Sequence, residues 1–168
     1  YWSDQRILKY ISMKRQIALS PDSKTFVVGN IDSSAMIIST ETGKIIHQLQ
    51  GHHQVVFAFD YSPDGKYIAT AGGDRAVILW ETETGKMVHR FLGHQELIFD
   101  VKFNSDGTKL ISGSWDGTMR IWDLKMPGDY YRIDLGSVSP YSVGFTNNGL
   151  YAVTGDLDRN VDFWEVDA

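Results

Sequence analysis

The sequence contains no cysteine, which excludes disulfide bonds, metal sites built from cysteine alone and a thiol nucleophile. It also lacks an apolar run long enough to cross a bilayer and a signal-peptide pattern at its beginning. The formal net charge of −5 argues against nucleic-acid binding, which relies on basic patches. A Gly-rich phosphate loop, a nucleophile elbow and a His-Glu-x-x-His motif are missing too. We therefore expect a cytoplasmic protein without membrane insertion, cofactor, metal site or enzymatic activity.

What the sequence does contain is one pattern repeated four times at a spacing of 42 residues. Ser20-Pro21-Asp22-Ser23 recurs in related form at 62–65, 104–107 and 146–149. Tryptophans keep the same interval at Trp80, Trp122 and Trp164. A fixed period of this length indicates a repeat architecture, in which each unit buries its core against its neighbours. We divide the single region 1–168 into repeats of approximately 1–39, 40–81, 82–123 and 124–168.

The third copy shows the unit most clearly and predicts short β-strands joined by tight turns. We expect strands over 97–103, 109–113 and 118–122 and, from the second copy, a further strand over 86–91. The turns contain Asp-Gly pairs, in which Asp bonds nearby backbone and Gly takes a positive φ. Four antiparallel strands in about 40 residues are typical of one blade of a β-propeller. The predicted fold is all-β, with four-stranded antiparallel blades.

The motifs of this unit resemble those of the WD-repeat propellers. The third copy has, in the family's order, Gly93-His94, Asn104-Ser105-Asp106-Gly107, Asp116-Gly117 and Trp122-Asp123. The resemblance implies a buried hydrogen-bond chain in each blade, made of a His, a Ser or Thr, an Asp and a Trp. In the two middle blades its members are expected to be His52, Thr70, Asp74 and Trp80, and then His94, Ser112, Asp116 and Trp122.

The outer copies keep less of this set. The fourth has Thr154, Asp158 and Trp164 but carries Gly136 in the place of the His. The first keeps only Asp32. Terminal repeats are often atypical. We therefore expect the two middle blades to be the stiffest part of the chain.

The sequence leaves the number of blades in the complete ring open. In this family the repeat is offset from the blade, so residues 1–11 are a candidate fourth strand for the blade formed by 139–164. Such an overlap would seal an open edge. Three arrangements remain: a piece of a longer propeller, half of an eight-bladed ring made by a homodimer, and a closed four-bladed ring.

Large side chains recur where each first strand enters its blade, and the resemblance places this position near the partner-binding face. The column holds Arg15, Phe57, Phe99 and Tyr141. A second column, just before the turn Asp, holds Ile31, Gly73, Trp115 and Leu157. Aromatic and Arg side chains on one exposed face are typical of protein-binding hot spots. The alternative is that Phe57, Phe99 and Tyr141 pack between blades and that Trp115 is a packing residue.

The remaining candidate residues give weaker signals. His47, His53 and His89 are expected on the solvated surface, in no metal-binding spacing. The leading interpretation is a protein–protein interaction scaffold that binds a protein or peptide partner. One alternative is a regulatory or sensory module of a larger signalling protein or enzyme. Another is catalysis in the central channel, which would be lined by Gln16, Asp60, Asp100 and Lys102.

Overall fold

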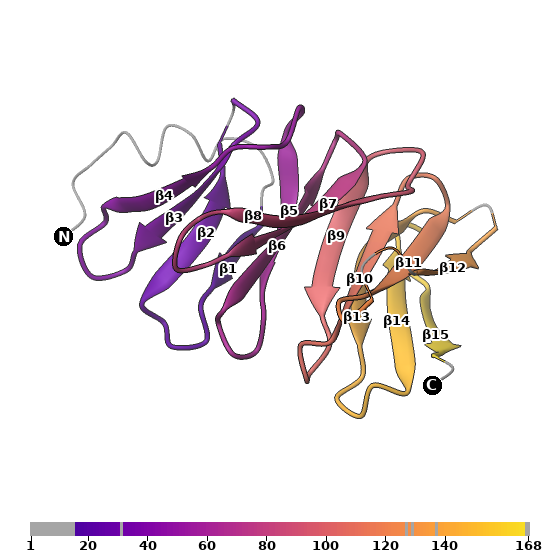
Figure 1. Cartoon of the computed structure of the whole chain (residues 1–168). Helices are drawn as coiled ribbons and strands as arrows, with labels where there is room; N and C mark the ends of the chain where they lie inside the picture. Colours follow the sequence, from indigo (N-terminus) through magenta and orange to yellow (C-terminus); the bar gives the residue numbers. More distant parts are fainter. Residues whose placement is uncertain (1–15, 31, 127, 129, 137, 167–168) are drawn as a thin grey trace.

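The computed structural model describes residues 16–30, 32–126, 128, 130–136 and 138–166, and these residues form four antiparallel sheets (Figure 1). The first sheet comprises β1 (Ile17–Leu19), β2 (Thr25–Gly29), β3 (Ala35–Ser39) and β4 (Ile45–Leu49). The second comprises β5 (Val56–Tyr61), β6 (Tyr67–Gly72), β7 (Ala76–Glu81) and β8 (Met87–Leu92). The third comprises β9 (Ile98–Phe103), β10 (Lys109–Ser114), β11 (Thr118–Asp123) and β12 (Tyr130–Asp134). The fourth comprises β13 (Pro140–Phe145), β14 (Tyr151–Asp156) and β15 (Val161–Glu165).

The Ser-Pro-Asp-Gly turns fold as their residues predict. In the second sheet, Ser62 donates its hydroxyl to Asp64 Oδ1 at 2.7 Å, and the same carboxylate oxygen accepts Lys66 N–H at 3.1 Å. Ser62 Oγ also accepts Tyr67 N–H at 2.9 Å, which begins the next strand. Gly65 has a φ of 73°, a conformation that costs glycine little. These local bonds set the register of β5 against β6.

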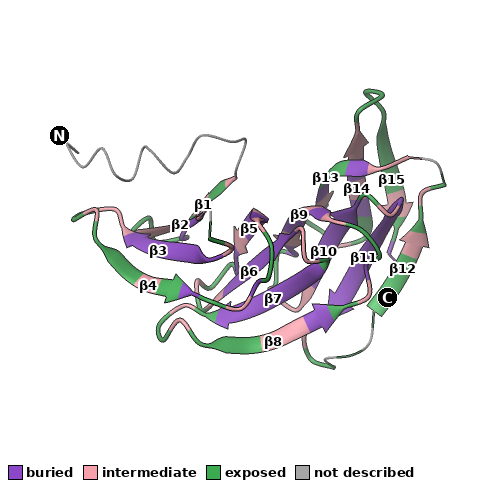
Figure 2. Ribbon diagram, turned by 90° about the horizontal axis from the view of Figure 1, so that it is seen from above, coloured by how far each residue is buried: buried purple, intermediate pink, exposed green. Residues whose placement is uncertain are grey.

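The hydrophobic core lies between neighbouring sheets rather than inside one. Each of the three junctions has its own cluster of buried side chains, centred on Phe59, Val101 and Val143 of the successive first strands. Contacts join β1 to β5, β5 to β9 and β9 to β13. Figure 2 shows the result from above: the buried strands follow an arc, with the first and fourth sheets at its two ends. The sheets therefore depend on their neighbours for burial.

The structure confirms the predicted all-β fold and its repeated four-stranded antiparallel sheets. Within the described residues, the fourth sheet has three strands and the arc does not close into a ring. Residues 1–11, the candidate sealing strand, lie outside the described residues, so this hypothesis stays a prediction. Among the residues that are described, none belongs to a helix of the length and apolar character that crossing a membrane requires.

Candidate functional site: an aromatic platform above a buried network

The second sheet brings together the four groups of the expected hydrogen-bond chain. Trp80 donates its indole N–H to Thr70 Oγ1 at 2.8 Å, and that hydroxyl lies 2.7 Å from His52 Nε2. His52 Nδ1 lies 2.8 Å from Asp74 Oδ1. Because the Thr70 oxygen accepts the indole proton, its own proton points to His52 Nε2, and His52 Nδ1–H is left to donate to the carboxylate. All four polar groups are thereby satisfied.

The third sheet repeats this chain with Ser in the place of Thr. Trp122 donates to Ser112 Oγ at 2.9 Å, and Ser112 Oγ lies 2.8 Å from His94 Nε2. His94 Nδ1 then lies 2.9 Å from Asp116 Oδ2. Thr118 adds a further donor, because its backbone N–H reaches Asp116 Oδ1 at 3.0 Å. The two middle sheets therefore contain equivalent networks one repeat apart.

Burial and hydrogen bonding set the protonation of these groups. Burial alone would raise the pKa of Asp74, but the hydrogen bonds from His52 and His53 N–H, with the charge of Arg90, outweigh it and lower the pKa to about 2. Burial also opposes ionisation of Asp116, but the hydrogen bonds from His94, Thr118 and Gln95 N–H outweigh it and hold the pKa of Asp116 well below its usual range. Burial lowers the pKa of His94, against the attraction of Asp116. His94 is therefore neutral at pH 7 and Asp116 is ionised.

The outer sheets keep only parts of the chain. In the fourth, Trp164 donates to Thr154 Oγ1 at 3.0 Å, while Asp158 is exposed and Gly136 supplies no side chain. In the first, Asp32 Oδ1 accepts Ser34 N–H at 3.0 Å. Without the His, the carboxylate is not drawn into the sheet. Four-group networks are therefore seen in the two middle sheets of the described chain.

The network also holds the loops that carry the proposed binding face. Asp116 Oδ2 accepts Gln95 N–H at 2.8 Å, which joins the turn after β10 to the loop before β9. The turn is fixed a second time because Trp115 N–H donates to Leu97 O at 2.9 Å. Asp74 makes the equivalent bond to His53 N–H at 3.1 Å. The residue before each turn Asp therefore sits on an anchored backbone.

Three of the predicted surface residues meet there and form what we call the aromatic platform: Phe99, Trp115 and Tyr141. The rings of Phe99 and Tyr141 stack across the junction of the third and fourth sheets, with centroids 4.3 Å apart. Trp115 lies against Phe99 of its own sheet, with the ring centroids 5.8 Å apart. Trp115 is nevertheless 59% exposed and Tyr141 46%.

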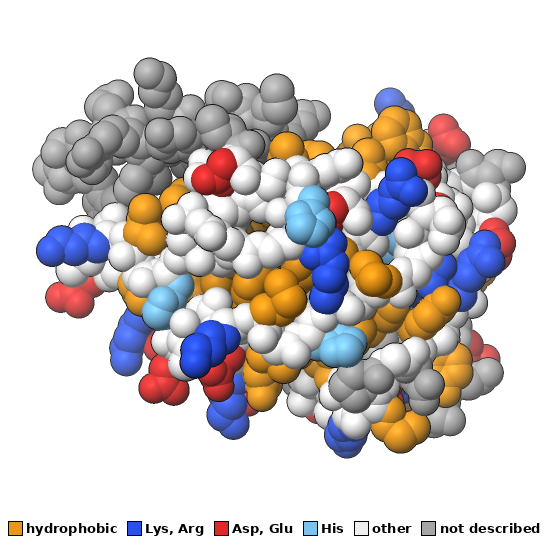
Figure 3. Space-filling model, turned by 45° about the horizontal axis from the view of Figure 1, so that its top comes forward, with side chains coloured by type: hydrophobic (Ala, Val, Ile, Leu, Met, Phe, Trp, Pro, Cys, Tyr) orange, Lys and Arg blue, Asp and Glu red, His pale blue; other side chains and the backbone are white. Residues whose placement is uncertain are grey.

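The other predicted surface residues differ in how much side chain they expose. Leu157 is exposed at the equivalent turn of the fourth sheet, and Phe57 is half-buried on β5. Gly73 has no side chain to offer, and Arg15 and Ile31 lie outside the described residues. Figure 3 shows hydrophobic side chains reaching the surface in separate groups among Lys, Arg and His. The described part of the predicted face is therefore concentrated on the third and fourth sheets.

The carboxylates predicted to line a central channel serve the contacts between sheets. Asp60 Oδ2 accepts Phe103 N–H of the next sheet at 2.7 Å, and Asp100 Oδ2 accepts Val143 N–H at 3.0 Å. Lys102 Nζ lies 3.7 Å from Asp60 and 3.8 Å from Asp100. Burial raises the pKa of Asp60, although Lys102 opposes it. The arrangement joins the inner strands and leaves neither carboxylate without a partner.

Sequence reasoning missed a further inter-sheet link of the same kind. Gln16 donates its side-chain amide to Asp100 Oδ1 at 3.2 Å, although two whole repeats separate them. Gln16, Ala58, Asp100 and Ser142 occupy one column at a spacing of 42 residues. Ser142 completes the set by donating its hydroxyl to Asp100 Oδ2 at 3.1 Å. The column shows that these four residues share one position of the repeat, but not that Gln16 reaches Asp100 two repeats away.

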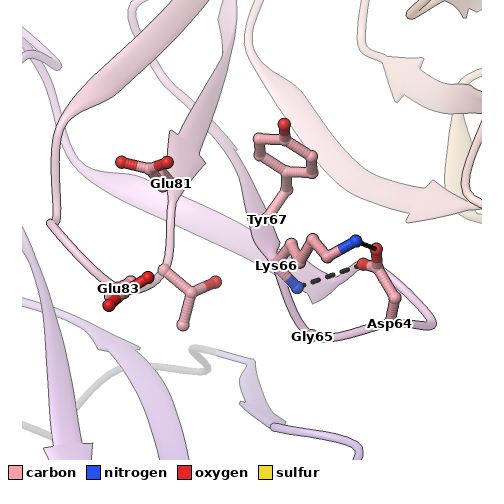
Figure 4. Close-up of a pocket in the computed structure, with 7 residues that line it drawn as sticks. Asp64, Gly65, Lys66, Tyr67, Glu81 and Glu83 are labelled. Atoms are coloured by element: carbon pink, nitrogen blue, oxygen red, sulfur yellow. Dashed lines mark hydrogen bonds and ion pairs between the residues drawn. The ribbon is translucent and has the colours of Figure 1, made fainter.

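A hollow of about 340 Å³ lies at the other end of the second sheet, between the turn at Gly65 and the turn at Glu83 (Figure 4). Its polar groups already serve the local turn, since Lys66 Nζ pairs with Asp64 at 3.2 Å. The described residues contain no group of three or more His, Asp or Glu side chains arranged to hold a metal ion. The aromatic platform is therefore a better candidate for a recognition site than this hollow.

Comparison with known proteins agrees with this geometry. The family described as WD domain, G-beta repeat matches residues 43–81 and 85–123, which include all the members of both networks. A search of curated proteins finds no match. WD40 repeats generally mediate protein–protein interactions, and propellers built from them are typically non-catalytic. The matched repeats and the repeated antiparallel sheets together identify the chain as a member of the WD-repeat family.

Proposed function

We propose that the chain is a non-catalytic interaction scaffold that binds a protein or peptide segment on the aromatic platform. The observation that carries this proposal is the meeting of Phe99, Trp115 and Tyr141 on one exposed surface. Aromatic side chains supply large contact areas at a low entropic cost, and Trp and Tyr are enriched among binding hot spots. The platform combines such rings from two sheets.

Rigidity of the supporting turn favours binding. Asp116 and the Trp115 backbone are each tied to the loop before β9, so the platform is formed before a partner arrives. A pre-organised site loses less entropy on binding than one that must be ordered. A partner that inserts an apolar or planar side chain against Trp115 would cover apolar surface that is now exposed.

The proposal is tested by selecting ligands for the chain from a displayed library of random peptides and measuring their dissociation constants. Trp115→Ala should weaken binding by about 2 kcal/mol, close to 30-fold. Tyr131→Ala is a matched control, because Tyr131 is 60% exposed on β12, away from the platform. Its affinity should equal that of the wild type.

Two results would overturn the proposal. Selected peptides that bind Trp115→Ala and the wild type equally would place recognition elsewhere. A larger loss of affinity in Tyr131→Ala than in Trp115→Ala would move the site to β12. Circular dichroism of each variant verifies that the fold is retained, which is expected because both side chains are exposed.

A further inference from the structure

The strands of the four sheets end on two opposite faces of the arc, and these faces differ in charge. The turns that join β1 to β2, β5 to β6, β9 to β10 and β13 to β14 lie on one face, as do the turns from each third strand to its fourth (Figure 1). Two turns of this face touch, since Ser105 Oγ donates to Asn147 O at 3.0 Å. The aromatic platform is on the other face, because Trp115 follows the end of β10 and Phe99 and Tyr141 lie near the beginnings of β9 and β13. We call the two the lysine face and the platform face.

Lysines gather on the face opposite the platform. Six of the seven described lysines lie on its turns or at the end of a strand beside them: Lys24, Lys44, Lys66, Lys86, Lys109 and Lys125. Lys66, for example, pairs with Asp64 at 3.2 Å. The seventh, Lys102, lies within β9 and is 3.7 Å from Asp60 and 3.8 Å from Asp100. No described lysine is therefore on the loops and turns that carry the platform.

The loops and turns that carry the platform are acidic. The third and fourth sheets place four carboxylates and one guanidinium there, which leaves a formal charge of −3: Glu96, Asp116, Asp156, Asp158 and Arg159. On β12, Arg132 pairs with Asp134 at 3.1 Å and adds no net charge. Ser114 donates its hydroxyl to Glu96 O at 3.0 Å, so the Glu96 backbone lies beside the residue that precedes Trp115.

The acidic turn of the fourth sheet lies beside Tyr141 and keeps its charge. Asp156 pairs with Pro140, the residue before Tyr141, in the ladder between β13 and β14. Asn160 donates to Asp156 through its backbone N–H at 2.9 Å and its side-chain amide at 3.0 Å, and these bonds lower the pKa of Asp156. None of the ion pairs formed by the described residues includes a residue of 156–160. A basic partner therefore meets carboxylates that are not already paired.

The arrangement of the three rings suits a planar cation. Phe99 and Tyr141 stack at an interplanar angle of 21°, so they cover one another and do not enclose a cage. Trp115 is tilted by 50° to Phe99 and is 59% exposed. The face of an aromatic ring attracts cations, and a guanidinium also stacks on it as a flat group. The same chain contains such a contact, because the Arg120 guanidinium lies 4.4 Å from the Tyr130 ring centroid.

We propose that the segment bound by the aromatic platform presents an arginine side chain, which stacks on Trp115 while the carboxylates of the platform face attract its charge. This inference rests on the proposed function and adds the chemistry of the partner. Exposed rings and a negative field are separate features of one surface, and both favour a cation. The field also speeds the approach of a basic segment and repels an acidic one.

The first test uses three displayed libraries of short peptides, which are random except for a fixed central arginine, leucine or glutamate. The arginine library should yield the tightest binders of the wild-type chain, and the glutamate library the fewest. The best arginine peptide is then synthesised with citrulline in place of the central arginine, which keeps the shape and removes the charge. Citrulline should weaken binding about 10-fold.

Two variants assign this loss to the platform face. Trp115→Leu keeps an apolar side chain but removes the ring, so the arginine peptide should bind about 10-fold more weakly and citrulline should cost little further affinity. Glu96→Gln should weaken the arginine peptide about 3-fold and reduce the salt dependence of its binding. Glu83→Gln is the matched control, because Glu83 is exposed on the lysine face, and it should change neither quantity.

The outcomes separate this inference from the proposed function. Leucine peptides that bind as tightly as arginine peptides, or a citrulline peptide that loses no affinity, would overturn the arginine; if Trp115→Ala still weakened binding, the platform would remain the site. Arginine peptides that bind Trp115→Ala as tightly as the wild type, or libraries without any binder, would overturn both. Circular dichroism verifies that each variant is folded.

Discussion

Thr70→Val removes the hydroxyl at the centre of the second sheet's network and keeps the shape of the side chain. In the wild type, the Trp80 indole N–H lies 2.8 Å from this hydroxyl oxygen and His52 Nε2 lies 2.7 Å from it. The change leaves both of these buried groups without a partner. A buried polar group that loses its partner costs about 1–3 kcal/mol. Thr70→Val should therefore lower the free energy of unfolding by roughly 2–6 kcal/mol.

The fourth sheet supplies the matched control. Thr154 also accepts an indole N–H, from Trp164 at 3.0 Å, but Gly136 stands where the His would be. One group loses its partner in Thr154→Val, and the Trp164 side chain is only half-buried. The expected loss is about 1 kcal/mol, at the low end of the range for one group.

Urea unfolding followed by far-UV circular dichroism measures both losses. The midpoint should shift much further for Thr70→Val than for Thr154→Val, with the slope m unchanged if the denatured state is unaffected. Equal losses in the two variants would refute the reasoning, because they would show that the His adds nothing to the requirement for the hydroxyl. A double substitution with Trp80→Phe isolates the coupling between the indole and the hydroxyl.

The remaining predictions concern the stability of the fold in acid and the effect of removing one buried charge. The pKa of Asp74 is lowered from 3.8 to about 2, so its contribution to the free energy of unfolding is complete above about pH 4 and is lost as the pH falls toward 2. Asp74→Asn should flatten the dependence of stability on pH in this range. An unchanged dependence would contradict the assignment. Burial lowers the pKa of His94 below 6.5, so protonating it opposes folding, and urea titrations should show stability falling as the pH drops below that value. Arg120 is 4% exposed, and its Nε and Nη1 find no hydrogen-bond partner among the described residues, although its guanidinium lies 4.4 Å from the Tyr130 ring centroid. Arg120→Met should therefore raise the free energy of unfolding by about 1 kcal/mol, and a lower melting temperature would show that the ring contact outweighs the unpaired charge.

Repetition explains how far the sequence could predict the fold. The turn motifs and the alternation of apolar residues are local signals, so strands such as Lys109–Ser114 and Thr118–Asp123 lie within a residue of their predicted ends. The networks around Thr70 and Ser112 were expected from the family's pattern of motifs, and the structure gives their distances.

Contacts between repeats were harder to predict because they depend on the angle between sheets. The hydrogen bond from Gln16 to Asp100 joins residues two repeats apart and skips the repeat that has Ala58 at this position, and no local sequence pattern predicts it. The stacking of Tyr141 on Phe99 likewise depends on how the third and fourth sheets meet. The number of blades that complete a ring also depends on this angle between neighbouring sheets. A periodic sequence therefore predicts the unit better than the assembly.

The anchored turns separate what holds the chain together from what a partner touches. Asp74 and Asp116 fix their loops from below, and the residue just before each of them, Gly73 or Trp115, makes no side-chain hydrogen bond that the fold requires. Substitutions at these tips can therefore accumulate without loss of the blade. The same scaffold can therefore change its recognition specificity by evolution at a few positions, because the backbone that carries each of them is held in place by the turn Asp.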